Sequence, residues 1–200
     1  EHILMHQVYG FAPSKILHLI SSNTIFGFMR GRPEFKKVRY KVEKNFVYFE
    51  NEDTLVPKNQ SALYDKIKIN FGKNMKFTAV VGNPPYQENI KGRGDQPSVY
   101  NYFLEAAYQI SGLVCMIHPA RFLFNAGSTP KKWNEKMLND EYFQVLLYEQ
   151  DSAKLFPNTD IKGGVVITLR NINNKTGGIG GSFLHFDELK TILNKVKPTM

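Results

Sequence analysis

The sequence predicts an α/β fold built on a largely parallel sheet. Strand-like and helix-like segments alternate through most of the chain, which is typical of strands joined by helical crossovers. Two of the strand-like segments are apolar runs without clear alternation, a pattern of strands covered on both faces. The chain has 200 residues, 42% of them hydrophobic, which suits one domain with a sizeable core. In such sheets ligands bind beyond the carboxyl ends of the strands.

The first half of the chain is expected to contain three strands and one helix. Residues 6–13 (HQVYGFAP) suggest a short strand and turn, and a helix follows at 14–26, where apolar residues recur at helical spacing before Gly27. A second strand is expected at 45–49 (NFVYF). The third, at 76–82 (KFTAVVG), is expected to be buried, because β-forming residues follow one another without clear alternation.

The second half is expected to continue the alternation. Ser98 is placed to cap a helix that extends to Ile110, and Thr129 with Pro130 to open another. A glycine-rich linker at 173–182 is expected to precede a helical tail. The remaining strands are expected at 113–119 (LVCMIHP), 143–149 (FQVLLYE) and 163–171 (GGVVITLRN).

The charge of the chain favours a polyanionic partner. The formal net charge is +8, and much of it is concentrated between residues 30 and 44. Two interpretations of this segment stay open, a solvated surface and an edge that contacts phosphate groups. Its basic residues are Arg30, Arg32, Lys36, Lys37, Arg39, Lys41 and Lys44.

The cysteine and histidine content excludes several classes of site. The single cysteine, Cys115, cannot build a disulfide framework or a thiolate cluster, which favours a reducing compartment. The five histidines show no metal-ligand spacing, so no metal is expected. No apolar stretch is long enough to span a membrane, and the first residues do not form a signal peptide. We therefore expect a cytoplasmic protein.

The stretch Val80–Gln87 (VVGNPPYQ) is the most specific pattern in the chain. Two consecutive prolines give a stiff backbone that presents carbonyl acceptors and no N–H donors, and Pro84 excludes Asn83 from the helical region. The Asn83 side-chain carbonyl and a neighbouring backbone carbonyl can then converge on one point. Two converging acceptors suit an amino group, which has two hydrogens to donate, and Tyr86 offers a flat apolar face beside it.

An exocyclic amino group on a planar ring fits this arrangement. Its lone pair is conjugated into the ring, and two acceptors that hold both hydrogens would localise the pair on nitrogen without a strong base. Stacking on an aromatic side chain is worth about 1–3 kcal/mol, comparable to the few kcal/mol needed to take a base out of a duplex.

The Asn-Pro-Pro-Tyr sequence after a strand resembles motif IV of the S-adenosylmethionine-dependent N6-adenine DNA methyltransferases of type II-like restriction-modification systems. The resemblance covers most of residues 1–170. It includes NEDTL as an acidic motif III, LVCMIHPARFLF as motif VI and LFPNTDIKGGVVITL as motifs VII and VIII. It implies a Rossmann-like methyltransferase sheet, mostly parallel, with helices on both faces and without its first strand. It also implies a catalytic-domain portion at 1–172 and, at 173–200, a linker and helical tail that lead toward a target-recognition region.

The resemblance implies the roles of individual residues and the partners. The cofactor is S-adenosylmethionine, and the substrate is a flipped adenine in double-stranded DNA, with a nuclease and a specificity region that are fused or separate. Asn83, Pro84, Pro85 and Tyr86 are the implied catalytic residues, and Asp53, Gly82 and Asn83 the implied cofactor-binding residues. The candidate DNA-binding residues come from the charge pattern. They are Lys36, Lys37 and Arg39 in the basic segment, Lys91 and Arg93 in the polar loop after the motif, and Arg121, for which a structural ion pair is the alternative.

Two departures from the family pattern keep other functions open. Ala12 stands about where the family carries an acid for the cofactor ribose, and the glycine-rich motif I is expected upstream of Glu1. We therefore expect a fragment, which by itself binds the cofactor weakly. The alternatives are a methyltransferase that acts on RNA or on a protein glutamine amide, and a non-catalytic DNA-binding fragment. Asp160 and Lys162 form an Asp-x-Lys pair, which we interpret as a chance occurrence rather than as a nuclease site.

Overall fold

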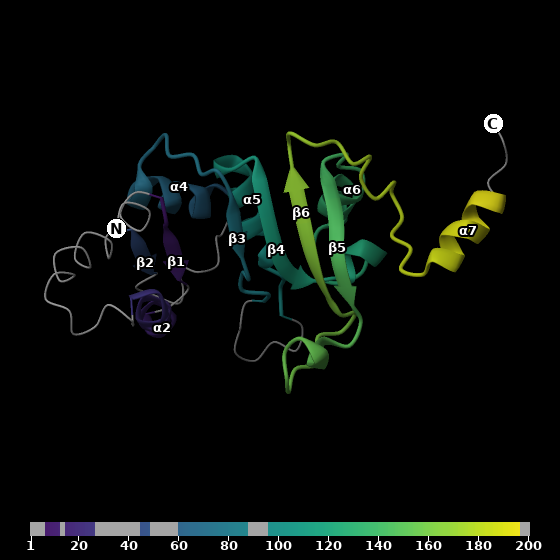
Figure 1. Ribbon diagram of the computed structural model, residues 1–200, viewed down its shortest axis with the longest axis horizontal. Coiled ribbons are helices and arrows are strands. Elements are labelled where there is room, and N and C mark those ends of the chain that lie inside the picture. The colour runs from purple at the N-terminus through teal and green to yellow at the C-terminus, as the bar shows by residue number, and fades with distance from the viewer. Residues whose placement is uncertain (1–6, 13–14, 27–44, 49–59, 88–95, 197–200) are drawn as a thin grey trace, which may run out of the picture. The chain divides into compact units, whose positions relative to one another are not determined.

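The computed structural model of the protein describes residues 7–12, 15–26, 45–48, 60–87 and 96–196 (Figure 1). The chain divides into two compact units, residues 1–75 and residues 76–200. Both units combine strands with helices, and the predicted α/β class is confirmed.

The first unit contains two short parallel strands, β1 (Gly10–Ala12) and β2 (Phe46–Tyr48). Helix α2 (Lys15–Phe26) follows β1 and contacts β2, where His18 Nε2 lies 3.1 Å from the carbonyl oxygen of Phe46. Parallel strands need a long crossover connection, which this part of the chain provides. The strands expected near residues 6–13 and 45–49 and the helix expected between them are all present.

Helix α4 (Gln60–Phe71) is an element that the sequence analysis does not predict. The ring of Phe71 at its end meets Tyr9 edge to face, with 5.4 Å between the ring centroids, and lies 6.4 Å from the ring of Phe11. These partners are distant in the sequence, so the contacts that fix the end of the helix are not visible in its own residues.

The second unit contains a four-stranded sheet in the order β3-β4-β6-β5 (Figure 1). Strand β3 (Val80–Gly82) is parallel to β4 (Leu113–Pro119). Strand β6 (Val165–Asn171) is antiparallel to both β4 and β5 (Phe143–Glu149). The strands β3, β4 and β5 therefore share one direction, and β6 alone runs against them.

The strand register brings several loops to one edge of this sheet. Gly82 at the end of β3 pairs with Met116 in the parallel neighbour β4, which continues to Pro119, so both strands run toward the same edge. Pro119 and Glu149, the last residues of β4 and β5, both pair with Val165, the first residue of β6. We call this the C-terminal edge, because it follows the ends of the three strands with a common direction.

A core cluster fills the space between this sheet and its helices. Helices α5 (Tyr100–Ile110) and α6 (Lys131–Leu138) and the short 3-10 helix η4 (Arg121–Phe124) contribute to it. Every second residue of β4 is buried, which is the pattern of a strand with one fully covered face. The fully buried members of the cluster are Leu104, Ala120, Phe122, Met137, Phe143 and Val166.

The expectation of a fully buried strand at 76–82 is wrong. Among the strands described in the second unit, β3 pairs with β4 alone, and the side chain of Val81 is 78% exposed. An apolar run predicts a strand, but burial also depends on what the fold places on either side of it.

The two predicted helix caps are also wrong. The residue before α5 is Val99, which makes no side-chain cap hydrogen bond, and Ser98 instead pairs with Gln87 in an isolated antiparallel bridge. The hydroxyl of Thr129 donates to Asn134 Oδ1 at 2.7 Å instead of capping α6. At Thr129 a tertiary side-chain partner binds the hydroxyl that the local rule assigns to the helix end, and at Ser98 the backbone is paired before the helix begins.

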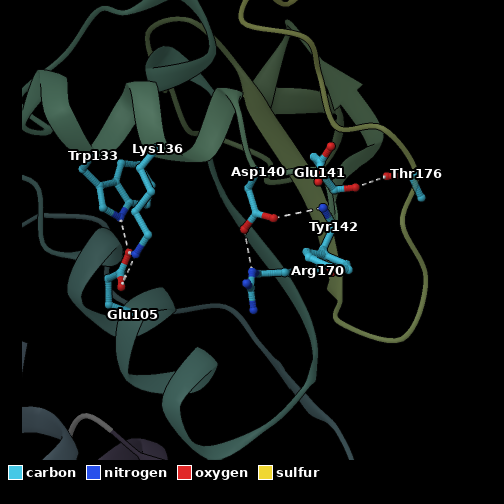
Figure 2. Close-up of polar contacts among 8 residues, drawn as sticks. All are labelled: Glu105, Trp133, Lys136, Asp140, Glu141, Tyr142, Arg170 and Thr176. Carbon is cyan, nitrogen blue, oxygen red and sulfur yellow. Dashed lines mark hydrogen bonds and ion pairs between the residues drawn. The ribbon is translucent and has the colours of Figure 1, made fainter.

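Polar contacts connect the helices of the second unit (Figure 2). Glu105 on α5 accepts hydrogen bonds from Trp133 Nε1 at 3.0 Å and from Lys136 Nζ at 2.6 Å, both on α6. After α6, Asp140 forms an ion pair of 2.6 Å with Arg170 on β6. Each of these contacts joins elements that are separated in the sequence, so together they hold the helical layer against the sheet.

The helical tail is present as α7 (Asp187–Val196). The segment before it is attached to the sheet region through Thr176. Its amide donates to the carbonyl of Glu141 at 2.9 Å, and its hydroxyl donates to the same carbonyl at 3.4 Å (Figure 2). Nearby, Tyr148 on β5 contacts the rings of Phe183 and His185. The chain between β6 and α7 thus packs along β5.

Candidate active site

The Asn-Pro-Pro-Tyr motif follows β3 directly, at the C-terminal edge. Asn83 is exposed, Pro84 is buried, and Pro85 and Tyr86 are half-buried. A buried proline next to an exposed asparagine fixes the backbone while the amide stays accessible. The motif therefore presents a polar side chain from a rigid support.

The end of the motif is bound to the start of α5. The amide of Val99 donates to the carbonyl of Tyr86 at 3.1 Å, and Gln87 pairs with Ser98 in the antiparallel bridge. These two backbone contacts determine where the Tyr86 main chain lies relative to the helix.

The Tyr86 side chain is half-buried, and its hydroxyl is in an unusual environment. The oxygen is buried and has no hydrogen-bond partner within the described part of the chain. Burial raises the pKa of Tyr86 to about 12, and the nearby Asn83 side chain opposes this shift without reaching hydrogen-bond geometry. The phenol is therefore neutral at physiological pH and does not act as a base.

The second-to-last residue of the neighbouring strand β4 is a buried histidine. His118 Nε2 lies 2.9 Å from Thr168 Oγ1, and Nδ1 lies 3.2 Å from the carbonyl oxygen of Pro119. Because a carbonyl only accepts, we assign the proton to Nδ1, and Nε2 then accepts from the Thr168 hydroxyl. The imidazole stacks on Tyr100, with 5.1 Å between the ring centroids.

Burial lowers the pKa of His118 to about 4, although its hydrogen bond to the Pro119 carbonyl partly opposes the shift. The imidazole is therefore neutral near pH 7, and both of its nitrogens are occupied by protein groups. This arrangement supports the strand end and does not leave a free base at the site.

Arg121 follows β4 at the same edge and is exposed. Burial raises the pKa of Tyr100, and both the Thr129 side chain and the positive charge of Arg121 oppose this shift. The guanidinium therefore lies within electrostatic range of the Tyr100 hydroxyl, near the start of α6.

The structure brings together one group of the residues predicted from the sequence. Gly82, Asn83, Pro84, Pro85, Tyr86 and Arg121 all lie at the C-terminal edge. Ala12, at the position of the expected ribose-binding acid, is the buried last residue of β1. The other predicted residues, Asp53, Lys36, Lys37, Arg39, Lys91 and Arg93, lie outside the described residues.

Asn101 is a polar residue at this edge that the sequence analysis does not identify. It lies in the first turn of α5, is 1% exposed, and its Oδ1 has no hydrogen-bond partner among the residues described. A buried carbonyl without a partner is costly, typically about 1–3 kcal/mol. The signal available in the sequence is an asparagine inside an otherwise apolar and aromatic helix start.

The described residues contain neither a cluster of metal ligands nor a membrane-spanning helix. In the described ranges, no group of three or more His, Cys, Asp or Glu side chains is arranged to hold a metal ion. Over the same residues, no helix is both long and apolar enough to cross a membrane. Cys115 is partly buried on β4, and Asp160 and Lys162 are exposed in the loop before β6.

A sequence model of the Eco57I restriction-modification methylase family matches residues 6–156. The match covers more than half of the chain, which therefore belongs to this family of methylases, enzymes that use S-adenosylmethionine as the methyl donor. The chain is also similar to an uncharacterized adenine-specific methylase of Mycoplasma pneumoniae, with 29% identity over 124 residues. That alignment covers 59% of this chain and 29% of the relative, so the chain spans less than a third of the relative's length.

Two solved structures show weaker similarity. One is PH1948 of Pyrococcus horikoshii, a proposed RNA methyltransferase, at 16% identity and a TM-score of 0.36 over 83% of this chain and 64% of that one. The other is SMU.776, a proposed methyltransferase in complex with SAH, at 12% identity and a TM-score of 0.39 over 84% of this chain and 47% of that one. These values are too low to support a conclusion about this chain.

Proposed function

We propose that this chain forms the amino-group-binding part of an adenine-N6 DNA methyltransferase of a restriction-modification system. The observation that carries the proposal is the position of Asn83 and Tyr86. In a chain of a methylase family, an exposed amide and a half-buried aromatic ring follow a sheet strand at the edge where ligands bind.

The proposed cofactor-binding residues at the end of β3 are accessible to a ligand. Gly82 and Asn83 are both exposed, and a Cβ placed on Gly82 would lie 3.2 Å from Met116 Sδ, so glycine at this position lets Met116 pack closely against the end of the strand. Gly82 and Asn83, together with Asp53, are the residues proposed to hold S-adenosylmethionine. When bound, this cofactor supplies an electrophilic methyl group on a sulfonium.

The residues of the motif act on the target amino group. The side-chain carbonyl of Asn83 and the backbone carbonyl of Pro84 each accept one of its hydrogens, which localises the lone pair on nitrogen. The amino nitrogen would form its bond to the methyl carbon while the sulfonium carbon–sulfur bond breaks, which leaves a neutral thioether, and it would lose one proton to solvent. Tyr86 provides a stacking face for the flipped base, and Pro85 keeps the backbone between them rigid.

Double-stranded DNA is the proposed partner. The net charge of +8 and the restriction-modification family support a nucleic-acid substrate. Residues 1–172 are proposed as the catalytic portion and 173–200 as the connection to a target-recognition region, with a nuclease fused or separate. A cytoplasmic location follows from a DNA substrate of this kind.

The test is methyl transfer by the full-length protein from labelled S-adenosylmethionine to duplex DNA, RNA and protein in parallel. We expect labelled N6-methyladenine in the duplex DNA alone. Label in RNA or in protein glutamine would replace the proposed substrate. Saturable DNA binding without methyl transfer would instead indicate a non-catalytic DNA-binding protein.

A further inference from the structure

The aliphatic part of Arg121 lies between two glycines from different loops. Gly127 follows η4, and Gly163 precedes β6. A Cβ built on Gly163 would lie 2.5 Å from Arg121 Cγ, and one built on Gly127 would lie 3.2 Å from Arg121 Cβ. We call the space between these two glycines the arginine slot.

Both glycines have backbone conformations that other residues rarely adopt, with φ of +90° at Gly127 and +85° at Gly163. The nearest Arg121 atoms are close to its backbone, so the side chain cannot avoid an added methyl group by moving its tip alone. The slot therefore depends on glycine at both positions, most strictly at Gly163.

The wall of the slot formed by Gly163 is held in place by two hydrogen bonds. The hydroxyl of Tyr148 donates to the carbonyl of Gly163 at 3.2 Å, and the amide of Ala120 donates to the carbonyl of Gly164 at 3.0 Å. The second bond connects the slot to the residue directly before Arg121. The side chain and the turn that encloses it are thus fixed to each other.

The charge at the end of this fixed side chain has no ion-pair partner among the described residues. Arg121 forms no ion pair with the residues that the structure describes, whereas Arg170 is paired with Asp140. Lys162, which is exposed and adjacent to Gly163, adds a second positive charge to the same turn. Because the aliphatic part of Arg121 is already ordered, binding of a ligand to its guanidinium would cost less side-chain entropy than binding to a freely rotating arginine.

We propose that Gly127 and Gly163 are positioning residues that hold Arg121 so that its guanidinium binds a phosphate of the nucleic-acid backbone. The planar fork of arginine suits the two oxygens of a phosphodiester. This inference rests on the proposed function, because it takes DNA as the ligand. In this proposal the arginine slot positions the DNA duplex against the C-terminal edge, whereas Asn83 acts on the target amino group.

The experiment measures the DNA affinity of the full-length protein across a series of salt concentrations. Each phosphate contact contributes about 0.9 to the slope of log affinity against log salt. We expect Arg121→Ala to lower the slope by about one such contact, and Gly163→Ala to lower it similarly. In the double variant Arg121→Ala/Gly163→Ala, the slope should be the same as in Arg121→Ala alone, because the arginine side chain that the added methyl group would displace is absent.

The chain offers a matched control for backbone strain. Gly177 has φ of +83°, close to that of Gly163, and nothing lies within 4 Å of a Cβ placed on it. Gly177→Ala should therefore keep the wild-type slope. If Gly163→Ala does not fold, as judged by thermal unfolding, Gly127→Ala provides the milder displacement of the same side chain.

A slope that falls in Arg121→Ala but stays at the wild-type value in both glycine variants would overturn the slot. An unchanged slope in Arg121→Ala would overturn the phosphate contact itself. Neither result affects the proposed function, which is tested by N6-methyladenine formation in the wild-type protein. If that product is absent, the proposed function fails whatever the salt slopes show.

Discussion

The indole Nε1 of Trp133 donates a hydrogen bond of 3.0 Å to Oε1 of Glu105, and this contact joins α6 to α5 (Figure 2). Glu105 is nearly buried, and Lys136 donates to the same carboxylate. A buried carboxylate stabilises the helix pair when donors satisfy it, and of its two donors the Trp133 N–H is buried whereas Lys136 is largely exposed.

Replacing Glu105 with alanine should therefore destabilise the protein. The change leaves the buried Trp133 N–H without an acceptor, and we expect a loss of about 1–3 kcal/mol in the free energy of unfolding. Lys136 is largely exposed, so Lys136→Ala should cost no more than about 1 kcal/mol. Urea denaturation of both variants checks this order, and equal losses would contradict the assignment of the main effect to Trp133.

His118 should make the stability of the second unit depend on pH. Burial lowers the pKa of the folded state to about 4, whereas an unfolded histidine has a pKa of about 6.5. The unfolded chain therefore binds more protons between these values. The stabilising contribution is present above pH 6.5 and is lost as the pH falls toward 4, by up to about 3 kcal/mol.

The measurement is the difference in unfolding free energy between wild type and His118→Val across this pH range, because carboxyl groups titrate in both proteins. Valine is a β-forming residue and has no titrating group, so the variant should show a flatter profile. Parallel profiles from pH 7 to pH 4 would mean that the imidazole does not titrate with unfolding.

Much of the second unit could be predicted from the sequence, because the bounds of its strands depend on residues within and directly beside each strand. Strands β4 and β5 have the bounds expected at 113–119 and 143–149, because each apolar run is limited by turn residues or charged residues. The caps of α5 and α6 could not be predicted, since the hydroxyl of Thr129 bonds to the Asn134 side chain rather than to the helix end. The exposure of β3 likewise depends on its place in the sheet.

The candidate site divides in the same way. Asn83–Tyr86 could be identified because two adjacent prolines restrict the backbone in a manner that the residues themselves determine. The packing of Arg121 against Gly163 could not, because these two residues meet through the pairing of β4 with β6. The role of His118 is also a tertiary property, since its partner Thr168 lies on the neighbouring strand.

Asn83→Ala in the full-length protein should act mainly on the chemical step. It removes one of two acceptors on the target amino group, and the acceptor matters most as charge develops on nitrogen. Loss of one preorganised hydrogen bond of this kind typically lowers the rate about 10²–10³-fold. Single-turnover methylation at saturating DNA measures this step, and a wild-type rate would show that the amide is not an acceptor.

The Tyr86 variants should act on capture of the flipped base instead. Tyr86→Ala removes the stacking face, so we expect a weaker signal from a fluorescent base analogue at the target adenine and a loss of about 1–3 kcal/mol in binding. Tyr86→Phe keeps the ring and removes a hydroxyl that has no partner among the described residues. It should therefore bind the base as wild type does and unfold at the same or a slightly higher temperature, because a buried phenol without a partner is lost. If Tyr86→Phe were as damaging as Tyr86→Ala, the hydroxyl rather than the ring face would make the contact that matters, and the stacking role would be wrong.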